Sequence, residues 1–164
     1  MAAAEDIALI KRQELELVLP AFDEHVAFAL GSAIYGRAKG ESLSLVVDIR
    51  SWDRQLFFAA TPGTSADNTE WVRRKINTVR RFQKASYRLV VERGGDAVFS
   101  EVVNAPATDY VIAGGGFPLR VANAGIIGCL AISGLPGRRD HGVAVDALCD
   151  YLGHDKTLFA LPPE

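Results

Sequence analysis

The residues whose types best suit chemistry gather between positions 110 and 141, in the segment YVIAGGGFPLRVANAGIIGCLAISGLPGRRDH. This segment contains a run of three glycines, Gly114, Gly115 and Gly116, which Phe117 follows. Because glycine permits backbone angles and close approaches that other residues forbid, the run can offer a concave set of backbone N–H groups to an anion or a flat ligand. A tight strand connection or a bulge needs the same freedom, so a structural role stays open beside the binding role.

Asp140 and His141 end this segment, directly after Arg138 and Arg139 and at the start of a predicted helix. Unpaired N–H groups and the helix dipole favour negative charge at such a place, so a carboxylate or a phosphate can dock there. His141 titrates near neutrality and suits a general base or a metal ligand. Asp140 is equally well explained as the N-cap residue of the helix, which needs no functional role.

Basic side chains without an acidic one mark the stretch from residue 73 to residue 88, at Arg73, Arg74, Lys75, Arg80, Arg81, Lys84 and Arg88. Such a row can grip phosphates. Basic helix faces are also commonly solvated or paired with acids, and this one lacks the interleaved aromatic platform of single-strand binders. The whole chain has a formal net charge of −2, which gives no general attraction to nucleic acid or to a membrane surface. We therefore expect no nucleic-acid partner and no membrane partner.

Signals for catalysis are weak. No GxSxG motif occurs, no paired carboxylates stand out, and neither Cys129 nor Cys149 has a histidine neighbour in sequence. Catalytic residues stay unassigned, and whether the chain is an enzyme stays open. The two cysteines form no CxxC pair and no histidine stands at zinc-ligand spacing, so we expect buried free thiols and no metal site. His25 can be a haem or metal ligand, or simply a helical histidine.

An alternation of helices and strands must position these residues. Apolar residues at spacings of three and four predict helices, and short runs of branched and aromatic residues between breakers predict strands. The expected helices cover residues 3–18, 22–37, 65–92 and a last segment that Asp140 caps, and the expected strands cover residues 42–51, 55–61, 110–113, 117–121 and 126–133. Asp67 and Glu70 resemble a capping box near the start of the long helix.

Runs of strands with hairpin-length connections favour an α+β fold, with a mainly antiparallel sheet and helices packed on its faces. A chain of 164 residues with 49% hydrophobic and 23% charged residues is typical of one folded domain, here residues 1–164, with an N-terminal helix at about 3–18 and a core at about 22–152. The glycine run lacks the GxGxxG spacing, which disfavours a dinucleotide fold. Because no apolar run reaches the length of a membrane helix and the acidic start lacks the basic region of a secretory signal, we expect a cytoplasmic protein.

Three segments carry a family resemblance: DNTEWVRRKINTVRRF at 67–82, GGGFPLRV at 114–121 and GIIGCLAISGLPGRRDH at 125–141. Together they resemble the haem-degrading-domain family related to GlcG and HbpS, most closely its branch of uncharacterised proteins with GGGFP and SGLPxxxDH motifs, over about residues 22–152. The resemblance implies a profilin-like three-layer α/β/α sandwich with a five-stranded antiparallel sheet, and assembly into symmetric homo-oligomers. In that branch a histidine usually precedes the glycine run, and here the position is Ala113. A ligand role for that histidine cannot apply to this chain.

The resemblance, taken with the glycine run, predicts a protein that binds a small ligand, either haem or another anionic molecule. The ligand-binding residues that we expect are Asn68, Trp71, Lys75, Asn77, Arg80, Gly114, Gly115, Gly116, Phe117, Asp140 and His141. Among these, Lys75, Arg80 or His141 would contact carboxylates. The alternative is a structural or adaptor homo-oligomer without catalytic activity, in which Trp71 and Phe117 are buried interface anchors.

Overall fold

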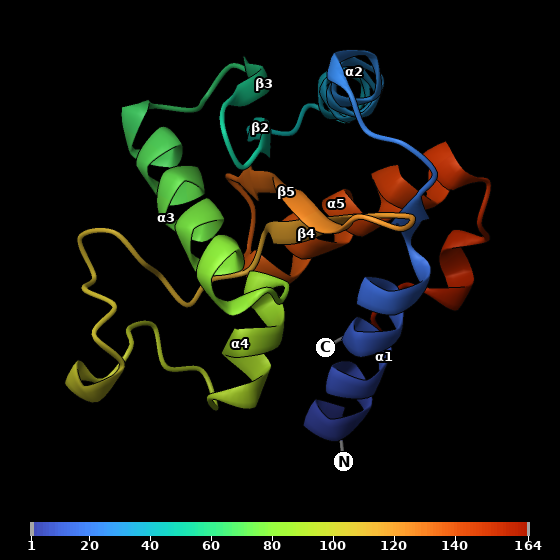
Figure 1. The fold of residues 1–164 in the computed structure, drawn as a ribbon. Coiled ribbons are helices and arrows are strands. Elements are labelled where there is room, and N and C mark those ends of the chain that lie inside the picture. Colours follow the sequence, from blue (N-terminus) through green and yellow to red (C-terminus); the bar gives the residue numbers. More distant parts are fainter. Residues whose placement is uncertain (1, 164) are drawn as a thin grey trace.

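The computed structural model describes residues 2–163 as a five-stranded sheet with helices on both faces (Figure 1). The strands are β1 (Val18–Leu19), β2 (Val46–Ser51), β3 (Gln55–Ala60), β4 (Gly116–Val121) and β5 (Gly125–Ser133). The helices are α1 (Ala2–Glu16), α2 (Glu24–Gly40), α3 (Ala66–Phe82), α4 (Ser86–Glu92) and α5 (Gly137–Leu152), with short 3-10 turns η1 (Glu101–Val103) and η2 (Lys156–Leu158). Within residues 2–163, no helix has both the length and the apolar character that crossing a membrane requires.

The sheet has the strand order β1-β4-β5-β2-β3, and β1 pairs with β4 in parallel while the other pairs are antiparallel. The α+β class is confirmed, but the expectation of a purely antiparallel sheet is wrong because of this one parallel pair. Residues 110–113, expected as a strand, are not one. Val111 instead exchanges two hydrogen bonds with the Thr78 hydroxyl group, and Val18–Leu19 takes the place beside β4.

Successive apolar side chains of β2 and β5 point to opposite faces of the sheet, so the core has two layers. Val47, Ile49, Leu130 and Ile132 belong to the large apolar cluster that α1, α2 and α5 cover. Val46, Cys129 and Ala131 point to the other face, where they pack against Val72, Ile76 and Val79 of α3. Because successive side chains of a strand face opposite ways, β2 and β5 bury both their faces. Figure 1 accordingly shows α3 and α5 on opposite sides of β4 and β5.

The long helix expected at residues 65–92 is two helices. Gln83 adopts a left-handed backbone conformation with φ of 56°, which ends α3, and α4 starts at Ser86. The backbone N–H group of Ala85, between the two helices, donates to Glu14 Oε1 of α1 over 2.7 Å. This hydrogen bond connects α1 to the junction of α3 and α4. Neither glycine nor proline marks the break in the sequence.

The N-terminal capping residues of α3 and α5 differ from those that the sequence predicts. The capping box of α3 uses Ser65 and Asn68 rather than Asp67 and Glu70. Helix α5 begins at Gly137 with Pro136 at its N-cap position, so Asp140 lies inside the first turn and does not cap the helix. Its carboxylate is free to make a longer-range contact.

The glycine run is a point of close packing among three parts of the fold. A Cβ atom on Gly114 would overlap the carbonyl group of Gly137, and one on Gly116 would lie 2.8 Å from Val79 Cγ2. Gly115 has a φ of +125°, and its Cβ would overlap the Ile132 carbonyl oxygen and lie 2.9 Å from Lys75 Nζ. The structure therefore gives each glycine a packing reason.

We predict that Gly115→Ala lowers the free energy of unfolding by about 2 kcal/mol or more, because the new methyl group meets β5 and the backbone angle is strained for alanine. Gly36→Ala is the matched control, since Gly36 lies inside α2 with no atom within 4 Å of the added Cβ. That control should raise the free energy of unfolding by about 0.5–1 kcal/mol. Urea titrations of both variants would contradict this account if Gly115→Ala were as stable as the wild type.

Candidate functional site

A buried ion pair joins α3 to α5. Lys75 Nζ lies 3.2 Å from Asp140 Oδ2, and the two side chains are 3% and 1% exposed. Lys75 Nζ also donates to the Ile132 carbonyl oxygen of β5 over 2.8 Å, and Asp140 Oδ1 accepts from the Leu135 backbone N–H group over 3.0 Å. This pair therefore connects two helices, a strand and the turn after it.

Burial dominates the electrostatics of the pair. It lowers the pKa of Lys75 and raises the pKa of Asp140, while their mutual attraction opposes both shifts. A lysine ammonium group has three N–H donors, and residues 2–163 offer two acceptors to it, Ile132 and Asp140. The third donor is available to a ligand.

An open hollow of about 310 Å³ lies against this pair. Its walls come from the first turns of α3, the glycine run, the turn after β5 and the start of α5. The lining residues are Asn68, Trp71, Lys75, Ala113, Gly114, Ser133, Gly134, Leu135, Gly137 and Asp140. We call this space the Lys75 hollow.

Asn68 and Trp71 form the α3 wall of the Lys75 hollow. Asn68 Oδ1 accepts from the Ser65 backbone N–H group over 3.0 Å, so the amide nitrogen is the part of the side chain left to serve a ligand. Trp71 Nε1 donates to Asp67 Oδ2 over 3.2 Å, and the Arg74 guanidinium group lies 4.4 Å from the Trp71 ring centroid. Both anchors hold the half-buried indole ring in one orientation.

The structure brings five of the predicted site residues together at the Lys75 hollow: Asn68, Trp71, Lys75, Gly114 and Asp140. Gly115 lies directly beneath Lys75 Nζ, and Gly116 packs against the backbone of Lys75. Ser133, Gly134, Leu135 and Gly137 also line the hollow, although sequence reasoning did not assign them to the site. All four residues belong to the SGLPGRR motif at 133–139, which could have indicated them. The sequence prediction includes only the two residues that follow this motif, Asp140 and His141.

His141 and Phe117 lie elsewhere. His141 is fully buried on the side of α5 that faces α1, where its ring centroid lies 5.4 Å from that of Tyr87 and 5.8 Å from that of Phe117. Adjacent residues of an α-helix point about 100° apart, which separates His141 from Asp140. Phe117 is 1% exposed in the core, so it cannot be an interface anchor as the adaptor hypothesis required.

Asn77 and Arg80 also stay outside the hollow. Asn77 Nδ2 donates to the Asp109 carbonyl oxygen over 2.9 Å. Arg80 is exposed, with its guanidinium group 6.0 Å from the Trp52 ring centroid. Asn77 therefore holds the loop that contains Asp109, and Arg80 faces solvent.

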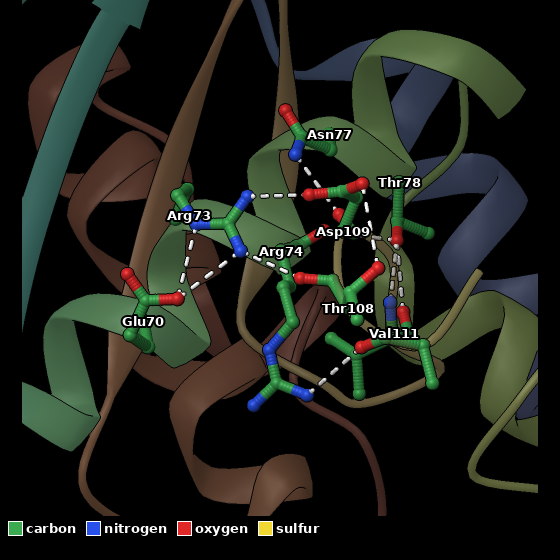
Figure 2. Close-up of polar contacts among 9 residues, drawn as sticks. Glu70, Arg73, Arg74, Asn77, Thr78, Thr108, Asp109 and Val111 are labelled. Atoms are coloured by element: carbon green, nitrogen blue, oxygen red, sulfur yellow. Dashed lines mark hydrogen bonds and ion pairs between the residues drawn. The ribbon is translucent and has the colours of Figure 1, made fainter. Parts of the chain in front are cut away.

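The basic face of α3 holds the segment of residues 103–111 by its backbone oxygens. Figure 2 shows the contacts that Arg73 and Arg74 make with the later part of this segment. Arg73 donates to the Thr108 carbonyl oxygen over 2.6 Å and pairs with Asp109, and Arg74 reaches the Ala107 carbonyl oxygen at 3.5 Å. Arg81 donates to the carbonyl oxygens of Val103 and Asn104 in the same way. Three of the seven basic side chains thus position the segment that leads into the glycine run, and Lys84 and Arg88 pair with acids. These contacts disfavour a phosphate-gripping role.

The two cysteine thiols, Cys129 and Cys149, are buried away from solvent. Both cysteines are buried free thiols, as expected, and burial raises the pKa of Cys149 to about 11. Among residues 2–163, no three or more histidine, cysteine, aspartate or glutamate side chains are grouped so that they could hold a metal ion. The chemistry that the site offers is therefore polar binding by an amine, an amide and backbone groups beside a flat indole ring.

Known proteins share this architecture. A solved structure of Ybr137w protein superimposes with a TM-score of 0.83 at 26% identity, covering 90% of this chain and 87% of that one. The structure of a PduOC:Heme complex superimposes with a TM-score of 0.65 at 25% identity, covering 79% of this chain and 94% of that one. Each superposition covers more than three quarters of this chain.

Sequence comparisons identify the family. The UPF0303 protein mlr5144 of Mesorhizobium japonicum is 57% identical over 165 residues, which span all of this chain and 99% of that protein. The model of the family described as haem degrading protein HbpS-like matches residues 22–149. The resemblance found in the three motif segments is thereby confirmed, and the chain belongs to the HbpS-like haem-degrading protein family.

Proposed function

We propose that this protein binds a small anionic molecule, with a carboxylate at the Lys75 hollow. The observation that carries the proposal is the position of Lys75 Nζ, which is nearly water-free, lies against the hollow and keeps one N–H donor unused by residues 2–163. A charge-assisted hydrogen bond in such a place is stronger than one at an exposed surface. The volume of about 310 Å³ suits a compact ligand.

Asp140 supports this role without competing for it. Its two carboxylate oxygens are already engaged by Lys75 and by the Leu135 N–H group. The carboxylate therefore fixes where the Lys75 ammonium group points. Asn68 Nδ2, in the first turn of the same helix α3, supplies a second donor, and the ring of Trp71 provides a flat apolar surface for the body of the ligand.

Haem is a candidate because the PduOC structure is described as a haem complex. Haem iron needs an axial ligand such as histidine, cysteine, methionine or tyrosine, and the residues that line the Lys75 hollow include none of these. Position 113, next to the glycine run, is alanine. The residues of this hollow therefore do not fit haem iron, and the proposal rests on the carboxylate alone.

We predict that succinate binds this protein and that succinamide, which has the same skeleton without charge, does not. Isothermal titration calorimetry should show that Asn68→Ala weakens succinate binding about tenfold, because one hydrogen bond to a charged group is lost. Arg80→Gln, which removes an exposed cation outside the hollow, should leave the affinity unchanged. Equal binding of succinate and succinamide would refute the proposal, and a Soret shift on adding haemin would identify haem as a ligand held elsewhere.

We also propose a homo-oligomer that forms through the edge strand β3. This strand pairs only with β2, within residues 2–163, and Phe58 on it is 41% exposed. Nearby, Phe28 of α2 is 65% exposed and its ring meets that of Phe57 edge-on at a centroid separation of 6.0 Å. An unpaired edge with exposed aromatic side chains favours pairing with another chain.

Native mass spectrometry tests the oligomer. We expect the wild type to give a multimer, and Phe58→Lys to shift the mass toward a single chain by placing a charge on the contact surface. Val102→Gln is the matched control, since Val102 is 92% exposed on η1 and far from β3 in sequence. A wild-type mass of one chain at micromolar concentration would contradict the proposal.

A further inference from the structure

A second hollow, of about 470 Å³, lies on the α1 side of α5 and shares no lining residue with the Lys75 hollow. It is enclosed by the first half of α5, by Gln13 of α1, by Arg37 of α2 and by the C-terminal residues 159–163. We call it the His141 hollow, because His141 is among the residues that line it. Its volume is that of an ordinary small-molecule site.

A chain of hydrogen bonds fixes the tautomer of His141. Gln13 Nε2 donates to the Phe159 carbonyl oxygen over 2.6 Å, so Gln13 Oε1 must be the atom that faces His141 Nε2 at 2.8 Å. A carbonyl oxygen can only accept, and the proton of the ring therefore sits on Nε2. Burial, with a contribution from Arg138, lowers the pKa of His141 to about 3, so the ring is neutral at physiological pH.

The other ring nitrogen is left without a partner. With the proton on Nε2, His141 Nδ1 carries a lone pair, and it is the one buried side-chain nitrogen or oxygen among residues 2–163 that makes no hydrogen bond. A buried acceptor without a donor is costly, and native proteins rarely keep one unless water or a ligand satisfies it. The lone pair calls for an O–H or N–H donor.

The charges around the His141 hollow favour an acid. Arg37 is paired with Asp146 and Glu41, and Arg138 is paired with Asp6. Arg139 lines the hollow, is exposed, and makes no ion pair with any residue from 2 to 163. The remaining walls are largely apolar and include Val143, Phe159, Leu161 and Pro162.

We infer that the His141 hollow is a second binding site, for a small organic acid whose apolar body carries an O–H or N–H donor. Arg139 binds the acid group, and His141 Nδ1 accepts from the donor. Because His141 is fully buried in the free protein, binding at Nδ1 requires the neighbouring wall to move. The tail residues Pro162 and Pro163 are exposed and line the hollow, and the Pro162 carbonyl oxygen accepts a hydrogen bond from Arg138, so displacing them costs that contact. This site is independent of the carboxylate site at Lys75.

Two probes with the same carbon skeleton test the inference: 3-phenyllactate, which carries a hydroxyl group, and 3-phenylpropionate, which lacks it. In protein with ¹⁵N-labelled histidine, long-range ¹H–¹⁵N spectra should show His141 as the Nε2–H tautomer with an unbonded Nδ1. We expect 3-phenyllactate to shift the Nδ1 resonance and to bind about fivefold more tightly than 3-phenylpropionate, which is the effect of one neutral hydrogen bond.

Variants separate the two sites. Arg139→Gln changes an exposed side chain, so it should fold normally, weaken 3-phenyllactate binding about fivefold and leave succinate binding unchanged. Asn68→Ala should do the reverse. The inference is overturned if 3-phenyllactate at millimolar concentration leaves the Nδ1 resonance unmoved, if both probes bind equally, or if Nδ1 is already hydrogen-bonded or protonated in the free protein.

Discussion

The ion pair between Lys75 and Asp140 is the constraint on which the rest of the site depends. It lies between the sheet and the first turn of α5, and a third contact, from Lys75 to the Ile132 carbonyl oxygen, ties it to β5. Charges in such a place are expensive to desolvate, so the intact pair adds little net stability, while removing either partner leaves the other uncompensated. The pair therefore acts mainly by specifying one arrangement of the surrounding elements.

That arrangement explains the glycine run. Lys75 can reach Asp140 only by passing over Gly115, where any side chain would stand in its way, and Gly114 lets the loop approach the first residue of α5. The basic side chains of α3 then hold residues 103–111, which deliver the chain into the run. Because Asp140 faces α3 and His141 faces α1, helix α5 supplies a wall to two separate hollows.

Much of this fold follows from local pattern. The apolar periodicity of α3 and of α5, and the branched runs of β2 and β5, are visible in the sequence because each element buries a continuous surface. Strand β1 could not be found this way, since two residues, Val18 and Leu19, become a strand only by pairing with β4. Residues 110–113 have the composition of a strand, but Thr78 takes the backbone groups of Val111, which is a tertiary contact.

The candidate site was partly visible for the same reasons. Lys75 is one basic residue within a basic row, and only its burial distinguishes it from Arg80, which faces solvent. Asp140 has the composition and position of a helix cap, and its ion pair depends on where α5 begins, one turn earlier than expected. The orphaned nitrogen of His141 depends on Gln13, more than a hundred residues away in the chain, so no local pattern contains it.

A double-mutant cycle on the central pair tests this account most directly. Lys75→Met and Asp140→Asn should each lower the free energy of unfolding by about 3 kcal/mol, because each leaves a buried polar partner unmatched. The double variant should be more stable than the sum of the two losses predicts, by at least about 1 kcal/mol. The exposed pair of Arg12 and Glu16, treated in the same way, should show a coupling of no more than about 0.5 kcal/mol. Additive losses at Lys75 and Asp140 would contradict the claim that this pair organises the site.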